Sequence, residues 1–320
     1  YRNVSGGNQD LSKESAAASQ TGFRTRKMVV ATGFFDGVHL GHRFILQQLL
    51  EEARKRGDES MVVTFWPHPR NVLQNDARNL RLLTSMEEKK KLLADIGIDK
   101  VEVIPFSREF SRLTTEDYLR DYVIAKFGGK AVLVGYDNRI GSDLCTPEQT
   151  AGIAEKLGLE VIKPVSYKTD NGIVISSTKI RNALSEGNID EANAMLGYPY
   201  QLYGVVISGN RLGHTIGFPT ANMQLYEPLK LVPGNGVYLV KVETLGRQWD
   251  GMCNIGVRPT LGSGNALTIE TNIFDFDEDI YGLDIRLSFV KKIRNEVKFN
   301  DLALLTSQLD KDRDLCRSLL

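Results

Sequence analysis

From residue 28 onward, apolar positions come in short continuous runs that alternate with longer amphipathic stretches. The amphipathic stretches carry apolar residues at helical spacing, and the runs are rich in β-branched residues. Strands are predicted at MVVATGFF (28–35), SMVVTFW (60–66), KVEVIPF (100–106), AVLVGYD (131–137) and EVIKPVSY (160–167), and helices at 42–56, 85–97, 114–128 and 147–158. This alternation predicts a Rossmann-like α/β domain with a parallel sheet covered on both faces.

After residue 200 the pattern changes to short strands separated by Gly, Pro and Asn. Such spacing predicts an antiparallel β-barrel, and the amphipathic stretch 299–320 predicts a terminal helix packed on it. Residues 1–27 show no apolar periodicity, and we expect a tail or an expression-tag remnant there. The expected domains are 28–187 and 200–320, joined by a linker at 188–199 that includes a small helix.

Composition narrows the class of protein. Lysine plus arginine equals aspartate plus glutamate at 40 each, so the long-range basic field typical of nucleic-acid binding is missing. The three cysteines are scattered and lack metal-binding spacing, which favours a reducing, cytoplasmic location. No apolar stretch approaches the roughly 18 residues of a membrane helix, and no signal peptide opens the chain.

The stretch GFFDGVHLGH (33–42) lies where the first strand meets the first helix. Its glycines permit close backbone approach, and a helix N-terminus attracts phosphate. His39 and His42 can donate hydrogen bonds to phosphate oxygens and stabilise charge on a departing pyrophosphate. A lone histidine would more often be a packing residue, but the spaced pair with its glycine favours a phosphate site.

A second motif, ISSTKIR (175–181), has the same potential. Ser177 and Thr178 lie at a predicted helix start, capped by Ser176 or Ser177, and Arg181 follows one turn later. A capping serine alone would explain this element equally well. Together, however, the HxGH and SSTxIR patterns resemble the nucleotidyltransferase superfamily, whose members transfer an adenylyl group from ATP.

GxFDGVHLGH together with TFWPHPR (64–70) and VGYD (134–137) is similar to the FMN adenylyltransferase module of bacterial bifunctional FAD synthetases. The PHP turn could also be only a rigid end to a strand. The segment after Asp137, NRIGSDLC, is shorter than the family pattern, which leaves a weakened adenylyltransferase as an alternative. The resemblance implies ATP contacts at Gly33, Phe35, Asp36, His39, His42, Ser177, Thr178 and Arg181, and a flavin–phosphate pocket near Pro67, His68, Asp137 and Asn138.

The stretch GNRLGHTIGFPTANM (209–223) combines small residues that can wrap a triphosphate with hard oxygen ligands suited to Mg²⁺. Its GFPTAN core resembles the riboflavin kinase fingerprint. That resemblance implies Glu270 as the general base for the riboflavin 5′-hydroxyl. The chain departs from the family pattern at His214, where arginine is common, and at Asn272, where histidine is common. We expect these two changes to tune the kinase activity rather than abolish it. The implied ATP contacts are Gly213, Gly217, Pro219, Thr220 and Asn222, of which Thr220 and Asn222 would bind Mg²⁺.

The expected function is bifunctional synthesis of FAD, in which riboflavin is phosphorylated to FMN and FMN is then adenylylated. ATP is the co-substrate of both steps, and each site should need Mg²⁺. No nucleic-acid or membrane partner is expected, and the oligomeric state stays unknown. Alternatives are a kinase with a weakened or inactive adenylyltransferase half, a non-catalytic flavin or nucleotide sensor, and a nucleotidyltransferase that acts on another phosphate. The predicted barrel with its GFPTAN motif argues against the last of these.

Overall fold

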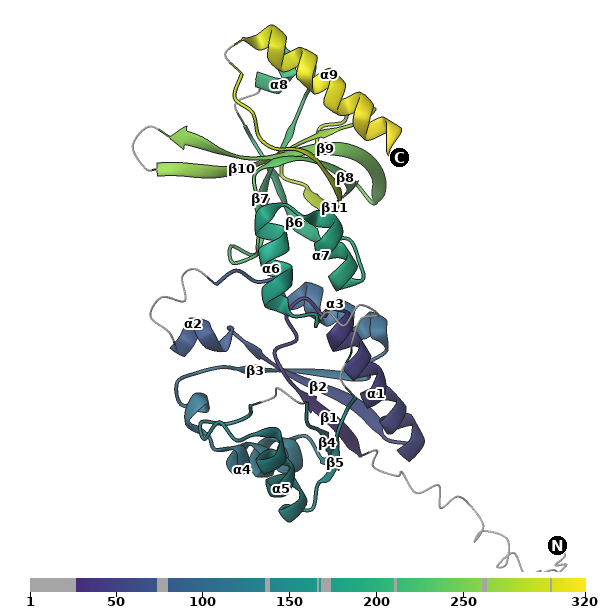
Figure 1. Cartoon of the computed structure of the whole chain (residues 1–320), viewed down its shortest axis with the longest axis vertical. Helices are drawn as coiled ribbons and strands as arrows, with labels where there is room; N and C mark the ends of the chain where they lie inside the picture. Colours follow the sequence, from purple (N-terminus) through teal and green to yellow (C-terminus); the bar gives the residue numbers. More distant parts are fainter. Residues whose placement is uncertain are drawn as a thin grey trace, which may run out of the picture.

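The computed structural model of this chain has three tiers along its long axis: a sheet with helices, a pair of helices, and a barrel (Figure 1). It describes residues 27–73, 80–135, 139–165, 167, 174–209, 212–260, 264–299 and 301–320. The predicted parallel α/β unit and the predicted antiparallel barrel are both confirmed.

Five parallel strands form the first tier, in the order β3-β2-β1-β4-β5. β1 is central and fully buried, as its continuous apolar run predicts. The strand order reverses beside it, and the carboxyl end of such a strand is where open α/β sheets bind ligands. The bounds are β1 Met28–Thr32, β2 Glu59–Trp66, β3 Lys100–Pro105, β4 Gly129–Leu133 and β5 Glu160–Ile162.

Helices cover both faces of the sheet. On one face, α1 (Leu40–Arg56) and α3 (Met86–Ile96) share an apolar cluster with alternate residues of β1. On the other face lie α4 (Thr115–Asp117), which continues as the π-helix η3 (Tyr118–Lys126), and α5 (Pro147–Lys156). Two short elements, α2 (Pro69–Leu73) and η2 (Phe110–Arg112), complete this tier.

Three predicted strands are shorter than expected, the first being the run 28–35, which leaves the sheet after Thr32. The run 131–137 leaves the sheet after Leu133, and the run 160–167 leaves it after Ile162. β5 pairs with β4 over only three residues, and Pro164 cannot donate a ladder hydrogen bond just beyond that point. The end of the predicted strand 131–137, residues 136 and 137, lies outside the described residues.

The middle tier consists of α6 (Ser177–Glu186) and α7 (Ile189–Leu196). Both helices end at glycines with left-handed backbone. Their apolar faces belong to the same core cluster as the barrel interior, and the Asn193 side chain donates a hydrogen bond to the Phe289 carbonyl at 2.9 Å. The helix that carries the ISSTKIR motif is therefore anchored on the barrel.

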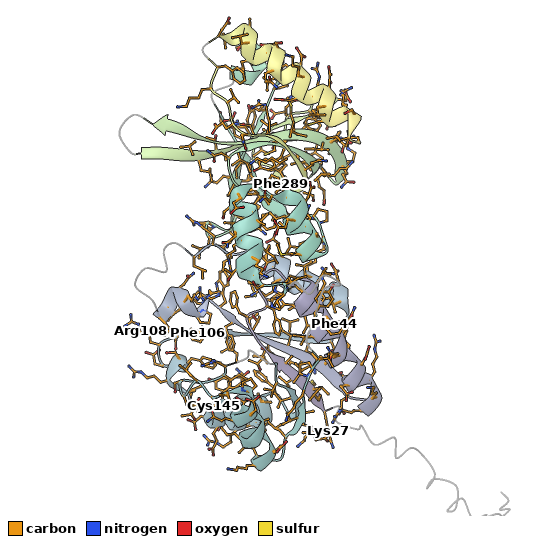
Figure 2. All side chains as sticks on the ribbon, viewed as in Figure 1. Lys27, Phe44, Phe106, Arg108, Cys145 and Phe289 are labelled. Carbon is orange, nitrogen blue, oxygen red and sulfur yellow. The ribbon has the colours of Figure 1, made fainter. Side chains whose placement is uncertain are left out.

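Six antiparallel strands close the barrel, in the order β10-β7-β6-β11-β8-β9. Phe289 of β11 lies inside it, fully buried (Figure 2). The predicted terminal helix is confirmed as α9 (Leu302–Ser318), which buries Cys316 against β8 and β9, and the short α8 (Leu212–Thr215) was not predicted. The strands are β6 Gln201–Ile207, β7 Ala221–Leu225, β8 Gly236–Thr244, β9 Arg247–Thr260, β10 Gly264–Ile273 and β11 Asp284–Arg294.

Within the described part of the chain, no helix has both the length and the apolar character that crossing a bilayer requires.

Candidate functional site

The turn between β1 and α1 is sharp and tightly packed. Gly37 has a φ of 81°, and a Cβ added there would lie 2.9 Å from the Leu83 side chain. Phe35 and Val38 also have left-handed backbone, with φ of 50° and 37°. Only glycine fits at position 37, and the strained neighbours lie at the mouth of a helix, where strain is often functional.

His39 and His42 stack at the start of α1. Their ring centroids are 3.6 Å apart at an interplanar angle of 16°. His39 caps the helix, because its Nδ1 accepts the backbone N–H of His42 at 3.3 Å. When neutral, the His39 ring therefore carries its proton on Nε2, where it can be donated.

Both imidazoles are neutral at pH 7. Burial lowers the pKa of His39 to about 4, against the attraction of Asp36. Burial also lowers the pKa of His42 well below its usual range, and the nearby charges of His39 and Lys89 act in the same direction. These side chains can thus offer polarised N–H groups to an anion, but not a full positive charge.

The GFFDGVHLGH motif of the first tier and the ISSTKIR motif of the middle tier meet at one cavity of about 540 Å³. Its wall also includes Phe34, Arg70 and Tyr167, which the sequence analysis did not single out. Among the predicted residues, Pro67 does not line the cavity, and Asp137 and Asn138 lie outside the described residues. The predicted residues that do line it are Gly33, Phe35, Asp36, His39, His42, His68, Ser177, Thr178 and Arg181.

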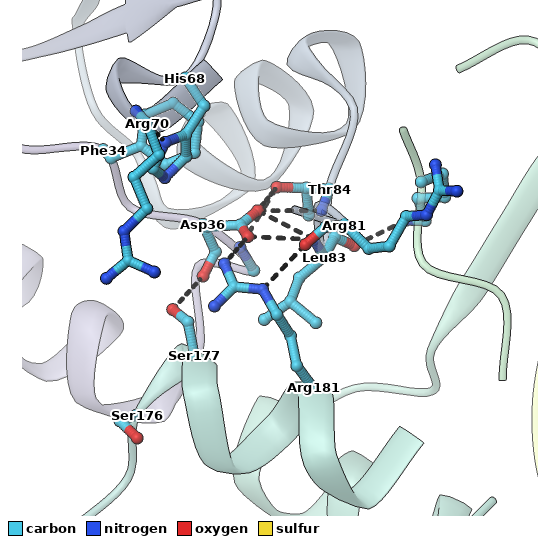
Figure 3. Close-up of polar contacts among 12 residues, drawn as sticks. Phe34, Asp36, His68, Arg70, Arg81, Leu83, Thr84, Ser176, Ser177 and Arg181 are labelled. Carbon is cyan, nitrogen blue, oxygen red and sulfur yellow. Dashed lines mark hydrogen bonds and ion pairs between the residues drawn. The ribbon is translucent and has the colours of Figure 1, made fainter. Parts of the chain in front are cut away.

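Asp36 connects three parts of the chain (Figure 3). Its carboxylate is only 3% exposed and accepts the backbone N–H groups of Leu83 and Thr84 at 3.0–3.1 Å. It also pairs with the Arg181 guanidinium at 2.5 Å, while Ser177 Oγ donates to the Asp36 carbonyl at 3.0 Å. Asp36 thus positions the cavity wall, and Ser176 rather than Ser177 is the residue that caps α6.

Sequence reasoning missed the segment 81–84. It contributes mainly backbone groups: the Arg81 carbonyl accepts Arg181 Nε at 2.8 Å, and the Leu83 and Thr84 N–H groups bind Asp36. Backbone N–H and C=O groups are the same in every sequence, so only the Thr84 hydroxyl could have been a signal.

In the barrel, Glu270 lies directly opposite Asn222 in the β10–β7 pairing. Residues opposite one another in an antiparallel pair share a face of the sheet. Both line a cavity of about 210 Å³, together with Thr220 and Asn272. The Asn272 side chain donates to the Pro219 carbonyl at 2.7 Å, which holds the Pro219–Thr220 turn beside Glu270.

Two glycines allow this turn to close. A Cβ on Gly209 would lie 2.2 Å from the Asn222 amide nitrogen, and one on Gly213 would lie 2.2 Å from the Phe218 carbonyl oxygen. Gly217 has a φ of 81°, in the left-handed region that favours glycine. The predicted residues Gly213, Thr220, Asn222 and Glu270 therefore come together, while Gly217 and Pro219 shape the approach.

The chemistry of this wall suits Mg²⁺. A hydroxyl, an amide and a carboxylate face one cavity, and all three offer hard oxygen ligands. Among the described residues there is no cluster of three or more His, Cys, Asp or Glu side chains that would hold a metal alone. A cation that keeps several waters and arrives with a phosphate, as Mg²⁺ does, fits such a set.

A second cavity, of about 390 Å³, borders the same turn. Pro219, Thr220 and Ala221 line it, with Phe276 and Tyr281 on its wall. Thr220 lines both cavities, so two ligands could meet at its hydroxyl.

These features define a class: a two-site enzyme of phosphate transfer, with a nucleotidyltransferase-like α/β domain and an oxygen-rich barrel pocket. Comparison with known proteins agrees. The FAD synthetase family model matches residues 23–179, and the riboflavin kinase family model matches residues 196–320. The chain belongs to the family of bifunctional riboflavin kinase/FMN adenylyltransferases.

The bifunctional riboflavin kinase/FMN adenylyltransferase of Listeria monocytogenes is 38% identical, covering 91% of both chains. Those of Bacillus subtilis and Escherichia coli K12 are 37% and 38% identical, over 90% and 89% of this chain and 90% of each relative. Among solved structures, one described as a macrolide-efflux protein from Streptococcus pneumoniae is 32% identical. It superposes with a TM-score of 0.83 over 92% of this chain and 94% of its own.

Proposed function

We propose that this chain makes FAD in two steps at two separate sites, phosphorylating riboflavin in the barrel and adenylylating FMN in the α/β domain. The observation that carries the proposal is the division of the two family matches between the two parts of the chain, each with its own cavity. The relatives named above carry both activities in their names.

In the barrel, the smaller cavity would take the flavin ring. Apolar side chains, including Phe218, Phe299 and Leu309, make up much of its wall, which suits a planar aromatic ligand. The larger cavity, with Phe276 and Tyr281, would take ATP. The riboflavin 5′-hydroxyl and the γ-phosphate would then meet beside Thr220, which lines both.

Glu270 would take the proton from the 5′-hydroxyl as its oxygen attacks the γ-phosphorus and ADP leaves. Its place opposite Asn222, on the face that holds Thr220, supports this role. Thr220 and Asn222 would hold Mg²⁺, which supplies positive charge to the transferring phosphoryl group.

In the α/β domain, an oxygen of the FMN phosphate would attack the α-phosphorus of ATP, and pyrophosphate would leave. The neutral imidazoles of His39 and His42 would donate N–H groups to the leaving oxygens, and the start of α6 at Ser177 and Thr178 would bind the phosphate chain. Asp36 would orient the Arg181 guanidinium toward the phosphates of ATP. Catalysis rests on positioning and charge stabilisation, without a covalent enzyme intermediate.

The flavin end of FMN would lie toward His68 and Phe34, whose rings are 3.9 Å apart on the cavity wall. Roles for Pro67, Asp137 and Asn138 in the flavin pocket stay predictions.

We also place the catalytic units at 28–187 and 200–320, joined through 188–199. A cytoplasmic location is in keeping with the free thiols of Cys145, Cys253 and Cys316.

One time course tests the proposal. The protein is incubated with riboflavin, ATP and Mg²⁺, and the flavins are separated at intervals. We expect FMN first and FAD later, with no product when Mg²⁺ is withheld. FMN that accumulates without FAD would favour the alternative of an inactive adenylyltransferase half, and unchanged riboflavin would contradict the kinase assignment.

A further inference from the structure

Lys89 is a buried cation that the mechanism above does not use. It is one of three consecutive lysines on α3, of which Lys90 and Lys91 are exposed and Lys89 is only 1% exposed. Its Nζ has no hydrogen-bond partner in the described part of the chain. An ammonium without such a partner is costly to bury, so its position calls for an explanation.

Glu88, the acidic residue next to Lys89 in the sequence, is engaged elsewhere. It forms the capping box of α3 with Ser85 and an ion pair with Lys230 of the barrel at 2.7 Å. The cap sets where α3 begins, and the Lys89 side chain extends toward Phe34. There its Nζ lies 3.6 Å from the centroid of the Phe34 ring, over the negative face of the aromatic system.

That ring belongs to the wall of the 540 Å³ cavity. Phe34 and His68 both line the cavity, with their rings edge to face, whereas Lys89 does not line it. The ammonium is therefore one side chain removed from the cavity. Burial is the main cause that lowers the pKa values of His42 and His68, and the charge of Lys89 adds a smaller contribution in the same direction at both imidazoles.

We propose that Lys89 is a positioning residue for adenylyl transfer: its buried ammonium, held behind Phe34 and one side chain away from the cavity, supplies positive charge that favours the polyanionic chain of ATP there. This inference rests on the proposed function of the α/β cavity. With Asp36 paired to Arg181, Lys89 supplies a positive charge that no described side chain pairs directly.

Burial lowers the pKa of Lys89 itself to about 8, against the attraction of Asp36. The cation is therefore present at pH 7 and is lost as the pH rises above about 8. FAD formation should decline over that range. The charged and titratable groups on the elements around it are Asp36 after β1, His39 and His42 on α1, His68 and Arg70 after β2, Glu88 on α3, Arg181 on α6 and Lys230 before β8.

The test compares Lys89→Met, which keeps the length of the side chain, with Lys89→Arg, which keeps the charge. Lys90→Met is the matched control, because Lys90 is the next residue in the same run of three lysines but is exposed. We expect kcat/KM for ATP in FAD formation from FMN to fall roughly tenfold in K89M and by less than about threefold in K89R, since one charge acts across a partly polar site. K90M should change it by less than about twofold. The riboflavin kinase rate reports the integrity of the other half of the same chain and should not change.

The pKa values of the neighbouring histidines distinguish the proposed role of the Lys89 charge from a purely structural role. Histidine ring titrations by NMR should show higher pKa values for His42 and His68 in K89M than in the wild type or K90M. An unchanged titration with an unchanged FAD rate would overturn the proposal. If K89M does not fold, K89R decides: its FAD rate should hold above pH 8 where the wild type declines, and parallel decline would refute the role.

A further variant distinguishes failure of the cavity assignment from failure of the role proposed for Lys89. His42→Asn should abolish most FAD formation if the cavity is the adenylyl-transfer site. Normal FAD formation by H42N would contradict the assignment of the cavity as the adenylyl-transfer site. Impaired FAD formation by H42N together with normal FAD formation by K89M would contradict only the role of Lys89.

Discussion

At the scale of single residues, chemistry depends on what surrounds each side chain. His39 is a helix cap, half of a stacked imidazole pair and a proposed phosphate donor at once. Glu270 is an ordinary strand residue by sequence, yet its neighbour across the ladder is Asn222. For both residues the neighbours, more than the residue type, define the proposed chemistry.

Removing the carboxylate of Glu270 should separate the two activities. In Glu270→Gln we expect riboflavin phosphorylation to fall by roughly 100-fold or more, since a positioned general base contributes about that much. FAD formation from supplied FMN should persist, because it takes place in the other cavity. Glu243→Gln, an exposed glutamate on β8 that pairs with Arg286, is the control and should retain both rates. Equal loss of both activities in E270Q would argue against separate sites.

The buried imidazoles should make the protein acid-sensitive. The unfolded chain binds a proton at His39 with a pKa near 6.5, whereas the folded chain resists protonation until about pH 4. Unfolding therefore takes up a proton between these values, and the free energy of unfolding should fall as the pH drops from 6.5 to 4. Above 6.5 this contribution is fully present and is on the order of 3 kcal/mol.

Urea unfolding at a series of pH values measures this dependence. His39→Asn should flatten it, because asparagine can still cap α1 but does not titrate. An equally steep dependence in H39N would assign the acid sensitivity to other groups, of which His68 is the first to test, since burial lowers its pKa to about 4 as well.

At the scale of elements, one carboxylate connects a turn, a loop and a helix. Asp36 binds the backbone at 83–84 and, through Arg181, the second turn of α6. Two motifs about 140 residues apart thus form one cavity wall. The sequence analysis predicted that the motifs share a site, but assigned Asp36 to ATP rather than to this structural connection.

Asp36→Asn should weaken both the fold and FAD formation. The change keeps the shape but removes the charge that pairs with Arg181, and breaking a buried ion pair costs about 3–5 kcal/mol. Differential scanning calorimetry should show the loss, with FMN formation largely kept. Asp121→Asn removes an exposed pair with Arg120 and should cost less than about 1 kcal/mol. A D36N protein as stable as D121N would contradict the role assigned to Asp36.

At the scale of the whole molecule, the two catalytic units are mechanically connected. Leu82 forms a parallel bridge with Lys230, and the Lys230 ammonium binds both Glu88 and the Leu83 carbonyl. The next peptide groups of this segment bind Asp36. A contact with the barrel therefore supports the same backbone that supports the α/β cavity, the proposed site of adenylyl transfer.

Weakening the contact of Lys230 with Glu88 and the Leu83 carbonyl should destabilise the wall of the α/β cavity. In Lys230→Met we expect faster hydrogen exchange at the backbone N–H groups of Leu83 and Thr84, because the Leu83 carbonyl and Glu88 lose their buried partner. The rate of FAD formation should fall with it. Lys241→Met, which removes an exposed pair with Asp250 on the barrel, is the matched control. Unchanged exchange in K230M would show that the contact does not support the cavity.

Much of this architecture is determined by sequence alone. Apolar periodicity predicted the parallel sheet, the barrel and the terminal helix, because strands and helices bury one face at fixed spacing. Residue types predicted the phosphate motifs, because glycine turns and helix starts impose their geometry locally. The lengths of β4 and β5 were overpredicted, since pairing with a neighbouring strand, not the run of apolar residues, decides where a strand ends.

Only the tertiary structure decided which groups are buried and what they face. Three adjacent lysines look alike in the sequence, yet only Lys89 is turned inward, under Phe34. A small helix was expected within the linker 188–199, but only the structure shows that its side chains share the barrel core. Burial and charge depend on contacts between distant segments, and so do the pKa values of the histidines. Local patterns can place such groups on an element, but only the packed molecule sets their surroundings.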